Sequence, residues 1–98
     1  MVSTTKRCFS NLFYGQKTVT TAGTAVILLA ATATATITIR AHDDNTGNVY
    51  VGDISVSSSN GYILSEGETV SFDANHADTN IYIDAATDGN GVSFIGAV

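Results

Sequence analysis

The clearest evidence of the fold class comes from residues 45–73, which read NTGNVYVGDISVSSSNGYILSEGETVSFD. Val49 and Val51 point to one side of an extended chain, and Val70 and Phe72 repeat this spacing further on. Residues rich in Gly, Asn and Ser form turn signals between the short apolar runs, at residues 46–48, 59–61 and 65–67. The second turn contains an Asn-Gly pair, which supplies positive φ at little steric cost. Alternation between closely spaced turns predicts short antiparallel strands that are buried on one face.

Three further segments before this stretch also predict strands. The clearest is residues 32–40, where Ala and Ile alternate with Thr and Arg at a period of two, so one face is apolar and the other is rich in threonine. Residues 24–29 are continuously apolar, which predicts a strand buried on both faces. Residues 17–21 predict a short polar strand with Val19 pointing inward.

The last strands are expected at residues 80–85 and 91–98, joined by a hairpin turn at residues 88–91. About eight strands with no convincing helix in the body predict an all-β fold, a small antiparallel β-sandwich or jelly roll, with a flattened barrel as the alternative. The inward positions form the expected core: Val26, Leu28, Ile37, Ile39, Val51, Val70, Phe72, Ile81, Ile83, Val92 and Phe94.

Residues 1–16 show no alternation, and we predict that they form an N-terminal attachment arm before a β-sandwich domain at residues 17–98. Phe9, Leu12 and Phe13 have the i, i+3, i+4 spacing that allows a helical turn. The alternative is a frayed tail, which is common at chain ends. The predicted partner-binding residues combine apolar anchors with positive charge: Lys6, Arg7, Phe9, Leu12, Phe13 and Tyr14.

Charge and composition restrict the partners. Residues 1–20 carry three cations and no acid, whereas residues 21–98 carry one cation and nine acids, for a net charge of −5. An acidic body excludes nucleic acid as its partner, because phosphate contacts need Lys and Arg. Charged residues make up only 13% of the chain, so part of its surface is expected to contact other subunits, and we predict a homotrimer.

Cysteine and hydropathy patterns restrict the protein further. Cys8 is the single cysteine, so an intrachain disulfide is excluded. The apolar run at residues 25–31 is too short to span a bilayer, so no membrane partner is expected. The preceding cations lie too far upstream of this run for a secretory signal.

No group of residues predicts catalysis. His42, Asp43 and Asp44 are adjacent, and residues 73–78 contain two Asp, one Asn and one His, but both groups fall in expected loops, where such side chains cap turns. Residues 88–91, Asp-Gly-Asn-Gly, lack the later bidentate Glu of a calcium loop. No nucleophile elbow or phosphate-binding loop is present. We therefore predict no enzyme activity, no cofactor and no metal.

Several short motifs resemble a small β domain found in structural proteins of tailed phages and prophages. They are TVTTAGTAV at residues 18–26, NTGNVYVG at 45–52, SSNGYIL at 58–64, GETV at 67–70 and IYIDAATDGNGVS at 81–93. The resemblance covers roughly residues 17–98. It implies a structural protein of the virion without catalytic residues.

From this resemblance we expect a non-enzymatic capsid decoration or cement protein on the outer surface of the phage head. Its partners would be the major capsid protein and other copies of itself, and burial of apolar area across subunit boundaries would stabilise the head. One alternative is a component of the tail, baseplate or fibre. Another is a carbohydrate-binding module, for which the exposed aromatics Tyr50, Tyr62 and Tyr82 would have to form one platform.

Overall fold

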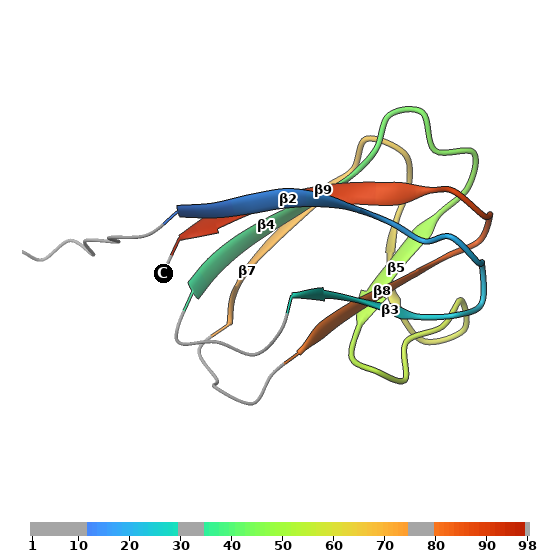
Figure 1. Cartoon of the computed structure of the whole chain (residues 1–98), viewed down its shortest axis with the longest axis horizontal. Helices are drawn as coiled ribbons and strands as arrows, with labels where there is room; N and C mark the ends of the chain where they lie inside the picture. Colours follow the sequence, from blue (N-terminus) through green and yellow to red (C-terminus); the bar gives the residue numbers. More distant parts are fainter. Residues whose placement is uncertain (1–11, 30–34, 75–79, 98) are drawn as a thin grey trace, which may run out of the picture.

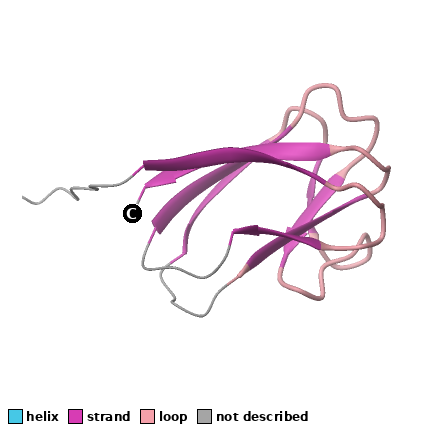
Figure 2. Ribbon diagram, viewed as in Figure 1, coloured by secondary structure: helices cyan, strands magenta, loops and turns pink. Residues whose placement is uncertain are grey.

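The structure, a computed structural model, describes residues 12–29, 35–74 and 80–97. These residues form eight strands in two four-stranded antiparallel sheets (Figures 1 and 2). The strands are β2 (Leu12–Thr18), β3 (Val26–Leu29), β4 (Ala35–Ala41), β5 (Val49–Gly52), β6 (Tyr62–Leu64), β7 (Thr69–Ala74), β8 (Ile81–Ala85) and β9 (Gly91–Ala97). The predicted all-β class is confirmed, and no helix able to cross a membrane is found within the described ranges.

The strand order is that of a jelly roll. One sheet has the order β2-β9-β4-β7 and the other has β3-β8-β5-β6. Strands equally far from the two ends of the series pair with each other: β2 with β9, β3 with β8, β4 with β7, and β5 with β6. A long hairpin of eight strands that rolls up on itself gives this pairing, with two Greek keys as the result.

The core lies between the sheets and follows the expected alternation. Ile37 and Ile39 of β4 are almost completely buried, opposite Gly96 and Phe94 of β9 on the same inner face. The neighbouring threonines of β4 face outward. All eleven expected core residues are either buried in one cluster or packed against it at partial burial. Other residues complete the buried cluster: Val19, Ala41, Val49, Leu64 and Ala85.

The first described strand begins and ends earlier in the sequence than predicted. The sequence places a strand at residues 17–21, but β2 occupies Leu12–Thr18. No helical turn forms at Leu12 and Phe13, because both residues are extended and paired with β9. The alternation is hidden in the sequence because glycine and lysine occupy inward positions while leucine and tyrosine occupy outward ones. The N-terminal part of the predicted arm, residues 1–11, lies outside the described residues.

Two other local predictions are wrong. Ile27 of β3 is exposed, so this strand is not buried on both faces. Residues 88–91 do not form a hairpin turn, because the strands that they connect belong to different sheets and β8 pairs with β3 and β5 instead.

The turn at Asn60 and Gly61 requires glycine for a reason other than the predicted positive φ. The positive φ values belong to Gly23, Gly67 and Gly89, not to Gly61. A Cβ on Gly61 would lie 2.6 Å from the Cβ of Tyr50 and 2.7 Å from a methyl group of Val56. Glycine is needed at this position because the loop packs tightly on β5, which also explains why Tyr50 is only 7% exposed on the outer face of its sheet.

The alternation on β4 generates a stability prediction. Replacing Ile37 by Ala removes a side chain from the sealed core, and the free energy of unfolding should fall by about 2–5 kcal/mol. Thr38→Ala is the matched control on the next residue, because Thr38 faces outward and loses one exposed hydrogen bond to Ser71. Urea denaturation of both variants measures the difference, and equal losses would contradict the assigned register.

Candidate assembly surface

The most distinctive surface of this domain is the outer edge of β2. This strand pairs with β9 on one side, and no other described strand pairs with its second edge. Alternate residues of this seven-residue strand therefore present unpaired backbone N–H and C=O groups along its free edge. Exposure alternates along the strand, because Leu12 and Tyr14 project outward and are 64% and 73% exposed.

The inner side of the same strand is held in register by two aromatic rings that lie on glycines. Phe13 of β2 is opposite Gly96 of β9, and Phe94 of β9 is opposite Gly15 of β2. A Cβ on Gly96 would collide with the Phe13 ring, and one on Gly15 would lie 3.0 Å from the Phe94 ring. Each ring fills the space above a glycine on the neighbouring strand, which pins the register of the first and last strands.

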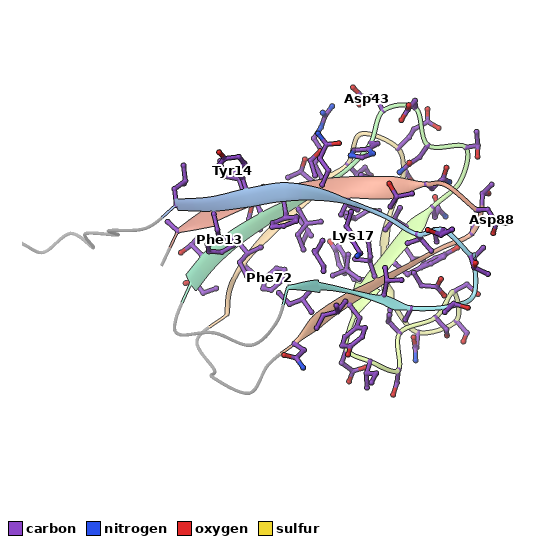
Figure 3. All side chains as sticks on the ribbon, viewed as in Figure 1. Phe13, Tyr14, Lys17, Asp43, Phe72 and Asp88 are labelled. Carbon is purple, nitrogen blue, oxygen red and sulfur yellow. The ribbon has the colours of Figure 1, made fainter. Side chains whose placement is uncertain are left out.

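The outer face above this pair is apolar. Tyr14 lies opposite Ile95, and Leu12 lies opposite Ala97, so four side chains form one continuous area that we call the β2–β9 patch. Ile95 is also exposed. Figure 3 shows Tyr14 and Phe13 projecting to opposite sides of β2, with Phe13 toward the space between the sheets.

The same outer face becomes polar over β4 and β7. The hydroxyls of Thr38 and Ser71 are 2.8 Å apart, and the Thr36 hydroxyl donates to the Asp73 carboxylate at 3.0 Å. These side chains satisfy one another across the strand pair. On this outer face, the apolar β2–β9 patch is therefore bordered by polar side chains of β4 and β7 that bond to one another. One half of the face is apolar and the other half is polar.

The loops at one end of the sandwich are held by buried polar side chains. Asn45 donates to the Gly91 carbonyl at 2.9 Å and accepts from the Gly91 N–H at 3.0 Å, so it pairs with that residue as a strand would. The buried carboxylate of Asp84 accepts the backbone N–H groups of Gly23 and Ala85. These groups fix loops that connect the two sheets, and this is a structural role.

The histidine and aspartates of the loop after β4 make contacts with neighbouring side chains. Asp43 pairs with Arg40 at 2.7 Å, and the His42 ring lies 3.0 Å from the Ser93 hydroxyl. Within the described ranges, no carboxylate bonds to the second ring nitrogen of His42, so the pair lacks the orienting group of a catalytic triad. No group of metal-binding side chains is found there either, and residues 75–79 lie outside the description.

The three tyrosines considered for carbohydrate binding do not lie on one face. Tyr62 lies opposite Val51 and therefore faces the inner side of its sheet, whereas Tyr50 faces the outer side and is covered by its loop. Tyr82 lies opposite Gly52, on the same side as Tyr50. Three aromatics on two different faces cannot form one stacking surface for a sugar.

The structure divides the predicted partner-binding residues into three groups. Leu12 and Tyr14 are exposed on the β2–β9 patch, whereas Phe13 packs against the core. Lys6, Arg7 and Phe9 lie outside the described residues. Sequence reasoning missed Ile95 as part of this surface, because its outward orientation follows from the inward Phe94 but its place beside Tyr14 depends on the pairing of β2 with β9. Whether the six residues bind a partner stays a prediction.

No protein-family model and no curated protein matches this chain. Its fold is similar to a solved structure of Bacillus endospore appendages, which are described as a family of disulfide-linked pili. The TM-score is 0.57 at 19% sequence identity, and the match covers 98% of this chain and 95% of that one. At this identity the likeness concerns the fold.

This comparison contradicts the expected function as a phage capsid decoration protein, since the matching fold belongs to a bacterial pilus. The physical reason for the error is that the motifs behind the resemblance encode strands and turns, which unrelated small sandwiches also need. The tail and fibre alternative rested on the same motifs and is set aside with it. The resemblance itself, the homotrimer, the capsid partner and the virion location are not tested by this match and stay predictions.

The two glycines under the aromatic rings generate a graded prediction. Gly96→Ala should lower the free energy of unfolding by about 1–3 kcal/mol, because its Cβ would also lie 2.6 Å from the Thr36 carbonyl oxygen, which cannot move aside. Gly15→Ala should change it by less than about 1 kcal/mol, since the Phe94 ring can shift and alanine suits a strand better than glycine.

Urea denaturation gives the two stabilities, and amide hydrogen exchange along β2 locates the effect. Faster exchange in β2 of the Gly96 variant alone is the expected result. Equal destabilisation by both substitutions would contradict the packing described above.

Proposed function

We propose that this protein is a non-enzymatic structural subunit that assembles with copies of itself into a fibre or pilus-like appendage. The observation that carries this proposal is the unpaired seven-residue edge of β2, with Leu12 and Tyr14 exposed beside it. The similarity in fold to an endospore appendage supports the same class of function.

Soluble sandwiches normally protect such an edge. They use short edge strands, prolines, bulges or charged side chains, because an unprotected edge pairs with other chains. Here the stretch from Leu12 to Gln16 contains neither charge nor proline. Lys17 is the one charged residue of β2, and it lies at an inward position and is half-buried. The exposed part of β2 is therefore suited to accept a strand from another copy.

A fibre requires that two different edges meet. If β2 paired with β2 of a second copy, the contact would be symmetric and would close at a dimer. Pairing of β2 with a different edge leaves one unused edge of each kind, and growth continues. The sandwich offers three other edges for this contact, β3, β6 and β7.

Disulfides cannot join this chain into a continuous polymer. Its 98 residues contain one cysteine, Cys8, and one thiol can form a disulfide with one other thiol. Cross-linking through Cys8 would end at pairs of chains. Fibres of this protein would therefore be held by strand pairing and apolar burial, in contrast to pili described as disulfide-linked.

The first test examines assembly by the full chain. Electron microscopy and sedimentation of the concentrated protein should reveal fibres. Tyr14→Lys should raise the concentration needed for assembly by at least about tenfold, because an interface that buries an unpaired ammonium loses more than about 1.4 kcal/mol.

Ser58→Lys is the matched control, because it adds the same charge to an exposed position in the loop between β5 and β6, outside every strand. It should assemble at nearly the wild-type concentration, and equal effects of the two substitutions would contradict a role of the β2 edge. A wild-type chain that stays monomeric at all concentrations would refute the proposed function.

The second test uses reduction. Fibres of the wild-type chain should persist in excess dithiothreitol, and Cys8→Ser should form fibres of the same appearance, because one thiol per chain cannot carry the polymer. Dissolution by dithiothreitol, measured by sedimentation, would contradict a non-covalent assembly.

A further inference from the structure

A second feature of the sandwich lies on the side opposite β2. An apolar groove with a cavity of about 370 Å³ opens between β7 of one sheet and β5, β6 and β8 of the other. Its walls are mostly aliphatic and aromatic side chains, with one carboxylate at the margin; the lining residues are Val51, Gly52, Asp53, Tyr62, Val70, Phe72, Asn80 and Ile81.

The two edge strands beside the groove differ in length. Edge strand β7 has six residues, whereas edge strand β6 of the facing sheet has three. The inward side chains Val70 and Phe72 of β7 are consequently only partly buried. Figure 3 shows Phe72 projecting into the space between the sheets. Incompletely covered core residues of this kind form a site that another apolar segment can fill.

The distribution of charge along the chain indicates which segment binds in the groove. Residues 1–11 carry Lys6 and Arg7 and no acid, whereas residues 12–98 carry two cations and nine acids. Asp53 at the margin of the groove offers a carboxylate to an approaching cation. The same segment contains Phe9, an aromatic side chain that needs an apolar site for its ring. The segment before β2 thus offers an apolar ring to fill the groove and positive charge to pair with the carboxylate at its margin.

We propose that the groove of each copy binds residues 1–11 of a second copy, with Phe9 in the apolar cavity and Lys6 and Arg7 toward Asp53. This inference rests on the proposed self-assembly and specifies a contact within it. It links the beginning of β2 in one sandwich to the opposite side of the next.

Geometry favours a second copy over the same chain. Leu12 lies in line with Ala97, Thr36 and Asp73 across the sheet, so about 14 Å separate it from the groove side of its own domain. Eleven residues span at most about 40 Å, which is sufficient for either arrangement. However, β2 runs outward to the end of the sandwich at Leu12, as Figure 1 shows. Entry into the same domain would require a reversal around three strand ends, whereas a neighbour needs none.

The native thiol provides the test, because Cys8 adjoins Phe9. In the full chain, Tyr62→Cys places a second thiol at the groove, on a residue that is 61% exposed and therefore tolerant of substitution. Mild oxidation should then join Cys8 of one copy to position 62 of the next and produce a ladder of covalent multimers on a non-reducing denaturing gel. The wild-type chain should give no species larger than a dimer.

Ile63→Cys is the matched control, because it is the adjacent residue, is 53% exposed and faces the other side of the sheet. It should give a much weaker ladder than Tyr62→Cys. Adding Cys8→Ser to the Tyr62 variant should abolish all species beyond the dimer, and adding Phe9→Ser should reduce the ladder. Mass spectrometry of the tryptic peptides should identify the bond between positions 8 and 62.

Three results would overturn this inference: equal ladders from the two cysteine variants, no ladder from Tyr62→Cys, or a faster-migrating monomer with an internal bond between positions 8 and 62. Electron microscopy of the same samples distinguishes its failure from that of the proposed function. Fibres without a specific ladder would refute the groove contact alone, whereas absence of both fibres and larger species would refute self-assembly as well.

Discussion

Pairing of the first described strand with the last organises this fold. A jelly roll closes only when β2 meets β9, and here two rings over two glycines set that register: Phe13 over Gly96 and Phe94 over Gly15. Gly91 at the start of β9 accepts a hydrogen bond from the Asn45 side chain and donates one to it, which ties the loop after β4 to the same strand. The pairing of β2 with β9 thus also holds the loop after β4 in place, through Gly91.

The same pairing leaves β2 at the edge of its sheet. A strand inside a sheet satisfies its backbone on both sides, but β2 satisfies one side within the described fold. Its outward residues Leu12 and Tyr14 extend the apolar area of β9 instead of protecting the edge with charge. Closure of the roll and exposure of the unpaired edge of β2 therefore have one structural origin.

The asymmetry of the sandwich bears on the kind of assembly it favours. An unpaired edge lies on one side, and an apolar groove between β7 and β6 lies on the other. Two different surfaces on opposite sides suit head-to-tail contacts, which continue indefinitely unless the rotation between copies closes a ring. A low content of charged residues, 13%, reduces the cost of burying such surfaces between copies.

The fold class, most strands and the core could be predicted from the sequence, because alternation at a period of two specifies which face of a strand is buried. Ile37 and Ile39 illustrate this, since their threonine neighbours leave one possible orientation. The sequence could not reveal β2 from residue 12 onward, because the inward positions hold Gly15 and Lys17 and only the ring of Phe94 makes the glycine part of the core. Likewise, the position of Ile95 beside Tyr14, the covering of Tyr50 and the open groove follow from how strands, loops and sheets meet. Those features depend on contacts between segments far apart in the sequence, which exist only in the folded chain.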